Sequence, residues 1–205
     1  MGRAGWAGGG AKKAETMAAL RGQAIAVLGL DPSLLEATVR RLAREGARLA
    51  LGAAEADHIA ELVAELRWEG AEIAALAIAG DGGGLVEPVV ALCAGAFGGV
   101  DAVVTDRRSA AASMGVLQRL GVGALVVVAR EDERHVALPA GADGSRRGCG
   151  GPDVSVVALP DRRAGAALPD AVARAVAFAL AAPAGTNVAT IAVRPTTAAD
   201  ALRAA

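Results

Sequence analysis

The chain has 205 residues, of which 54% are hydrophobic, and its formal net charge is −1. A chain of this length can bury one sizeable core but is short for two, so we expect residues 17–205 to form a single domain. A charge so close to zero gives no electrostatic reason to expect nucleic acid or an anionic membrane as partner. No apolar run approaches the roughly 20 residues that cross a membrane, and the first residues lack the apolar stretch of a signal peptide. We therefore expect a cytoplasmic protein.

Residues 1–16 are rich in Gly, Ala and Lys and have no periodicity, which predicts a disordered leader. From Gln23 onward, short β-branched runs alternate with longer helical patterns, which is typical of a parallel sheet with crossover helices. We therefore predict an α/β fold, a Rossmann-type doubly wound parallel sheet of about seven strands. The predicted strands are Ala24–Leu28, Arg48–Leu51, Glu72–Ile78, Ala102–Thr105, Ala124–Ala129, Val154–Leu159 and Thr190–Val193. Apolar residues at helical spacing predict helices around Leu34–Leu42, Ile59–Leu66, Val86–Phe97 and Pro169–Leu180.

One segment, Arg130 to Asp153, breaks this alternation. It contains Pro139 and a run of glycines, and it has no helical periodicity. A crossover between parallel strands normally needs a helix. We therefore expect the helix region between the fifth and sixth strands to be truncated, leaving either a minimal crossover or a mobile loop.

The turn after the first strand is the most informative part of the chain for function. In a dinucleotide-binding fold, glycines in this turn let the backbone approach a pyrophosphate, which binds the free N–H groups at the helix start. Here only Gly29 remains, and Ser33 followed by Glu36 matches a capping box that would satisfy those N–H groups. Asp31 and Glu36 add negative charge, and Leu35 adds bulk. The sequence predicts a closed phosphate site, with Gly29 and Ser33 as the cofactor-binding residues if a nucleotide binds.

Five arginines follow three consecutive predicted strands, at the edge where open α/β sheets bind ligands. They are Arg107, Arg108, Arg130, Arg162 and Arg163. One interpretation is an anion site held by bidentate guanidinium contacts. The other is that each arginine pairs with a neighbouring acid and that the charges only cover a vacated pocket.

The cysteines and histidines predict neither a disulfide framework nor a metal site. Cys93 lies in an apolar helical stretch and is expected to be a small buried hydrophobic residue. Cys149 lies in a glycine-rich loop in which nothing suggests an activated thiol. His58 and His135 have no partner at the spacing of metal ligands, so we expect no metal.

Five segments together carry a family resemblance. They are Met17–Val27, Leu42–Ala53, Phe97–Val104, Pro169–Val176 and Asn187–Thr196. In order, they resemble the first strand, the second strand, the approach to the fourth strand, the last helix and the last strand of short-chain dehydrogenase/reductases. The last two are most similar to NADP-dependent members. The resemblance implies a Rossmann fold that binds NADP or NAD and catalyses an oxidoreduction.

The motifs that carry the family's chemistry are not matched. Ser33 and Leu35 stand in the places of the second and third glycines of its cofactor turn, and Thr105–Arg108 replaces its Asn-Asn-Ala-Gly segment. Its catalytic serine would fall near Ala129 or Arg130, neither of which can serve.

The family's catalytic tyrosine and lysine are lost as well. In the family, the lysine lowers the tyrosine pKa so that the tyrosine can donate a proton to the carbonyl. This chain has no tyrosine, and its only lysines are Lys12 and Lys13. The resemblance therefore implies a degenerate member with no catalytic residues and no bound cofactor.

These losses predict a pseudoenzyme that acts as a scaffold or regulatory partner. The alternative is an NAD(P)-dependent oxidoreductase with an altered cofactor site, in which Arg107 or Arg130 binds the phosphates. The family commonly associates through its last helix and last strand. This implies a homo-oligomer, or a hetero-oligomer with an active paralogue, through residues 169–194. The residues expected to pack there are Val172, Val176, Phe178 and Ile191.

Overall fold

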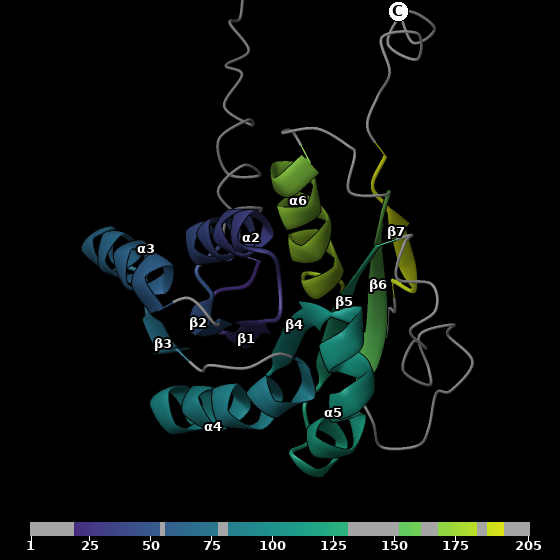
Figure 1. Ribbon diagram of the computed structural model, residues 1–205, viewed down its shortest axis with the longest axis horizontal. Coiled ribbons are helices and arrows are strands. Elements are labelled where there is room, and N and C mark those ends of the chain that lie inside the picture. Colours follow the sequence, from purple (N-terminus) through teal and green to yellow (C-terminus); the bar gives the residue numbers. More distant parts are fainter. Residues whose placement is uncertain are drawn as a thin grey trace, which may run out of the picture.

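A computed structural model of the chain describes residues 19–53, 56–77, 82–130, 152–160, 168–183 and 188–194. Within this part, seven parallel strands form one sheet in the order β3-β2-β1-β4-β5-β6-β7 (Figure 1). They are β1 (Ala24–Leu28), β2 (Arg48–Ala53), β3 (Ile73–Ala77), β4 (Ala102–Asp106), β5 (Ala124–Arg130), β6 (Asp153–Leu159) and β7 (Thr190–Ala192). The predicted Rossmann-type fold is confirmed. The leader and the segment between β5 and β6, where a truncated helix region was predicted, lie outside the described residues.

Helices cover both faces of the sheet (Figure 1). They are α2 (Pro32–Arg44), α3 (Ala56–Trp68), α4 (Val86–Phe97), α5 (Arg107–Arg119) and α6 (Leu168–Leu180), with a short 3₁₀ helix η1 (Gly82–Leu85) before α4. The helices α2, α3 and α6 pack on one face, and α4 and α5 on the other. None of the described helices is both long and apolar enough to span a bilayer.

The two cores follow from the alternation of side chains along each strand. In β1, Ile25 and Val27 face the core under α2, α3 and α6, whereas Ala26 and Leu28 face the core over α4 and α5. Every residue of β1 is buried, as expected for a strand covered on both faces. Cys93 is buried in the second core, and burial raises the pKa of its thiol to about 11. This confirms its prediction as a buried hydrophobic residue.

The helix α6 corrects one part of the predicted contact surface. Val172 and Val176 are fully buried in the chain's own core, whereas Phe178 on the same helix is 66% exposed. Ile191 on β7 is partly buried against that core. The prediction that the two valines face a partner is wrong, because they are needed under α6. Phe178 remains as the large apolar side chain that α6 exposes.

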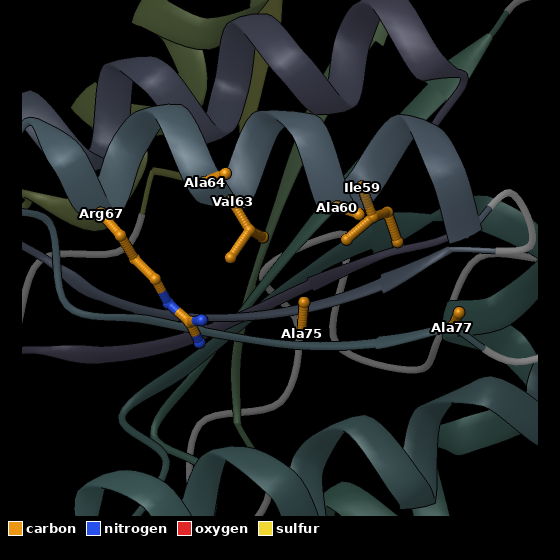
Figure 2. Close-up of a pocket in the computed structure, with 7 residues that line it drawn as sticks. All are labelled: Ile59, Ala60, Val63, Ala64, Arg67, Ala75 and Ala77. Atoms are coloured by element: carbon orange, nitrogen blue, oxygen red, sulfur yellow. The ribbon is translucent and has the colours of Figure 1, made fainter.

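An apolar groove of about 350 Å³ runs along the free edge of the sheet between α3 and β3 (Figure 2). Its walls include Ile59 and Val63 from the helix and Ala75 from the strand. Arg67 lies at one end and donates hydrogen bonds from Nε and Nη2 to the Ile73 carbonyl oxygen, at 3.1 and 2.8 Å. Among the described residues that line the groove, Arg67 is the one with a charge, so they offer no pair of groups for acid–base chemistry.

Candidate functional site

The sheet has a topological switch point between β1 and β4. From β1 the chain continues to β2 and β3 on one side, and it then returns to place β4 on the other side of β1. The strands β1 and β4 lead into α2 and α5, which lie on opposite faces. In open α/β sheets, ligands bind in the crevice at the carboxyl ends of such strands. This crevice is the candidate site.

The start of α5 fills the space beside Gly29, the first residue after β1. A Cβ atom at Gly29 would lie 3.0 Å from Asp106 Oδ1 and from Ser109 Oγ, and 3.2 Å from Thr105 Oγ1. Gly29 has a φ of +70°, a left-handed conformation that glycine adopts at little cost. The missing side chain thus makes room for the chain's own β4–α5 turn.

The predicted capping box at the start of α2 is wrong. The N-cap is Asp31, with Pro32 as the first helical residue, so Ser33 already lies within the first turn. Proline is favoured at this position because it has no N–H to satisfy and its φ is already helical. Asp31 makes no side-chain capping bond. Leu35 is buried in the core and does not project into the turn.

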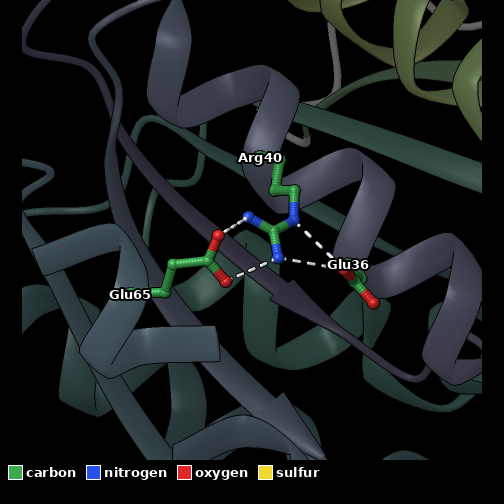
Figure 3. A network of polar contacts seen from close by, with 3 residues as sticks. All are labelled: Glu36, Arg40 and Glu65. Atoms are coloured by element: carbon green, nitrogen blue, oxygen red, sulfur yellow. Dashed lines mark hydrogen bonds and ion pairs between the residues drawn. The ribbon is translucent and has the colours of Figure 1, made fainter. Parts of the chain in front are cut away.

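Glu36, the other half of the predicted capping box, binds Arg40 one turn further along α2 (Figure 3). Arg40 also makes a bidentate contact with Glu65 of α3, at 2.6 and 2.7 Å. The hydrogen bonds between Arg40 and Glu65 lower the pKa of the Glu65 carboxyl group and raise the pKa of the Arg40 guanidinium group. This network links α2 to α3.

Asp31 forms an ion pair with Arg130, which lies at the end of β5. Because β4 lies between β1 and β5, the pair spans the switch point. The Arg130 side chain is only 12% exposed, whereas that of Asp31 is 44% exposed. The Asp31 carboxylate, whose charge was predicted to repel phosphates, is therefore paired with the Arg130 guanidinium group.

Of the four remaining predicted arginines, the structure describes Arg107 and Arg108. Arg107 is half-buried, and its buried Nε has no hydrogen-bond partner among the described residues. Arg108 is exposed, and Arg162 and Arg163 lie outside the described residues. Arg130 pairs with Asp31, 99 residues away in sequence, and its neighbouring acids Glu131 and Asp132 lie outside the described residues. The five-arginine anion site stays a prediction.

Thr105 is a site residue that the sequence did not single out. Its Oγ1 is fully buried and has no hydrogen-bond partner among the described residues. It lies beside Gly29, at the centre of the switch point. A threonine in an apolar strand carries no local signal of such a role, because its place beside Gly29 depends on strand order.

The described residues offer no constellation for hydrolysis or metal chemistry. They contain no group of three or more His, Cys, Asp and Glu side chains that could hold a metal ion. Ala129, near which the family's serine would fall, is 5% exposed and packs in the core beside α4 and α5. The side chain of His58, together with His135 and Cys149, lies outside the described residues.

Comparison with solved structures finds the same fold in oxidoreductases. A short-chain dehydrogenase/reductase from Serratia marcescens has a TM-score of 0.65 and 18% sequence identity, covering 85% of this chain and 97% of that one. A metagenomic short-chain oxidoreductase in complex with NADP has a TM-score of 0.60 and 18% identity, covering 87% of this chain and 100% of that one. An NADH-dependent reductase, A1-R', complexed with NAD has a TM-score of 0.63 and 17% identity, covering 86% and 97%.

Sequence comparison adds one distant relative. The (2S)-[(R)-hydroxy(phenyl)methyl]succinyl-CoA dehydrogenase subunit BbsC from Thauera aromatica is 30% identical over 103 residues, which are 50% of this chain and 41% of that protein. The match thus spans about two fifths of the relative's length. No family model matches the sequence. Together with the strand order and the switch point, these likenesses show that the chain has the fold of the short-chain dehydrogenase/reductases.

Proposed function

We propose that this protein is a non-catalytic relative of the short-chain dehydrogenase/reductases that acts as a scaffold or regulatory partner. The observation that carries the proposal is the close packing of the β4–α5 turn against Gly29, together with the Asp31–Arg130 ion pair at the carboxyl ends of the strands. The whole sequence also contains no tyrosine, so it lacks the family's proton donor. A protein that has this fold but lacks the proton donor is best explained by a function that depends on surface contacts with partners and not on catalysis.

Catalysis is tested directly by turnover. We expect the purified protein to leave the absorbance of NADPH and NADH unchanged in the presence of a panel of aldehydes and ketones. The reason is that the sequence has no tyrosine to donate the proton, and that the described β4–α5 turn packs against Gly29, beside which a cofactor pyrophosphate would bind. Enzyme-dependent oxidation of either cofactor above the buffer rate would contradict the non-catalytic role.

The partner surface we propose lies within residues 169–194. Phe178 is 66% exposed on α6, and aromatic residues are enriched at protein–protein interfaces. The relative from Thauera aromatica is named as a subunit of a dehydrogenase, which favours a role within an assembly. We propose a homo-oligomer, or a hetero-oligomer with an active paralogue, in which this surface is covered.

Phe178→Asp is expected to convert an oligomer of this protein into a monomer, because it places a charge at the centre of the apolar contact. The fold should be retained, since Phe178 is mainly exposed. Light scattering of the purified protein measures the mass. Trp68→Asp is the matched control, because Trp68 is 92% exposed on α3 and lies outside the proposed surface. A mass unchanged by Phe178→Asp would contradict this surface.

A second candidate is an NAD(P)-dependent oxidoreductase with an altered cofactor site. It is favoured by Gly29, which keeps the left-handed conformation of a glycine turn, and by the buried Nε of Arg107, which has no partner among the described residues. Two proteins of the same fold are described in complex with NADP and with NAD. In this alternative, Arg107 or Arg130 binds the cofactor phosphates.

A further inference from the structure

The N-cap residue of α2, Asp31, forms an ion pair instead of a capping hydrogen bond. Asp31 occupies the N-cap position, where an aspartate commonly accepts a hydrogen bond from the first turn, yet it makes no such bond. Its carboxylate instead binds the guanidinium group of Arg130. An acidic side chain thus lies between the positive end of α2 and a largely buried arginine, two groups that both favour an anion.

Polar groups that suit an anionic ligand are present at the same place. Thr105 Oγ1 is fully buried, has no hydrogen-bond partner among the described residues, and lies beside Gly29 at the start of the β1–α2 turn. A buried hydroxyl without a partner costs free energy, and a ligand oxygen that reached this hydroxyl would accept its hydrogen bond and remove that cost. This hydroxyl is independent of the ion pair and marks the same crevice.

We propose that the Asp31–Arg130 ion pair is an autoinhibitory contact. The Asp31 carboxylate takes the place of a phosphate group on Arg130 and at the start of α2, so a phosphate-bearing ligand binds only by displacing it. This inference rests on the proposed closed crevice and identifies one contact that helps to keep it closed.

The unequal exposure of the two partners determines which one moves. Arg130 is 12% exposed and lies at the end of a central strand, so the surrounding chain holds it in place. Asp31 is 44% exposed in the turn, so solvent and ligand both reach its carboxylate. An incoming phosphate competes with Asp31 for Arg130, and the displaced Asp31 turns outward or caps α2.

The test compares binding of inorganic pyrophosphate, by calorimetry, to the wild-type protein and to Asp31→Asn. Asparagine keeps the shape of the side chain and is a good N-cap, but it no longer supplies a charge to Arg130. We expect Asp31→Asn to bind pyrophosphate at least about tenfold more tightly than the wild type. Equal affinities would overturn the proposal. If Asp31→Asn fails to fold, Asp31→Ser replaces it, since serine is also a favoured N-cap.

Two further variants separate this contact from a general effect of charge. Asp170→Asn removes the same charge from an exposed pair with Arg174 on α6 and should leave pyrophosphate binding unchanged. Asp31→Asn/Arg130→Gln should lose the gain in affinity, because the proposed phosphate partner is gone. Retention of the gain in this double variant would also overturn the proposal. Tight NADPH binding by the wild type would instead contradict the proposed function, whatever the variants show with pyrophosphate.

Discussion

Gly52→Ala is expected to lower the free energy of unfolding by about 3 kcal/mol, as overpacking of a rigid core does. A Cβ atom at Gly52 would lie 2.2 Å from Cγ2 of Val89, which is fully buried on α4. Val89 is β-branched and has one strongly preferred rotamer in a helix, so it cannot turn away. The strand cannot retreat either, because Gly52 pairs with Leu28 on one side and Leu76 on the other. Urea unfolding measures the loss.

Two variants control this result. Gly95→Ala lies on the same helix as Val89, has open space around it, and should raise stability by about 0.5–1 kcal/mol through the helix propensity of alanine. The double variant Gly52→Ala/Val89→Ala should lose about 1 kcal/mol less unfolding free energy than the two single variants lose in total. The reason is that the new methyl group at position 52 occupies the space that Val89 vacates. Strict additivity would show that the close approach of β2 to α4 is not the cause.

Gly29→Ala is expected to cost about 2 kcal/mol, because alanine is strained in a left-handed conformation and the new Cβ meets three oxygen atoms. The contacts at 3.0 Å involve Asp106, whose Oδ1 accepts the Ser109 N–H at 2.8 Å and so caps α5. This capping bond holds the neighbours in place. The variant should melt at a lower temperature in a calorimetric scan.

Gly22→Ala separates the two causes. Gly22 has a φ of +76° but nothing within 4 Å of the added Cβ, so it carries the backbone strain without the crowding. Its cost should be about 1 kcal/mol. If Gly29→Ala costs no more than Gly22→Ala, the start of α5 does not fill the space beside Gly29, and the closed crevice loses its main support.

The strands were predictable because the signal for each is local. In β5, for example, the apolar run from Ala124 to Ala129 predicts a strand covered on both faces, and the observed strand ends one residue later at Arg130. The signal for α6 is local as well, because its apolar residues recur at helical spacing. Periodicity predicts an apolar stripe, but it does not tell whether Val172 and Val176 on that stripe face the chain's own sheet or a partner.

The site was less predictable for two reasons. Two signals compete for the start of α2, and the partner of Asp31 is distant in the sequence. Pro32 and Ser33 both favour a helix start, and the helix begins at the proline, so the serine falls inside the first turn. The partner of Asp31 is Arg130, 99 residues away, and only the order of the strands brings them together. No local spacing in the sequence predicts that pair or the place of Thr105 beside Gly29.

In the proposed function, the crevice at the switch point is closed to dinucleotides. A calorimetric titration of the wild-type protein with NADPH and with NADH, followed in parallel by thermal melting, tests it most directly. A closed crevice predicts no heat of binding and no rise in melting temperature up to millimolar cofactor. Tight binding with a melting temperature that rises with cofactor concentration, as mass action requires, would contradict a closed crevice and establish the cofactor site as open.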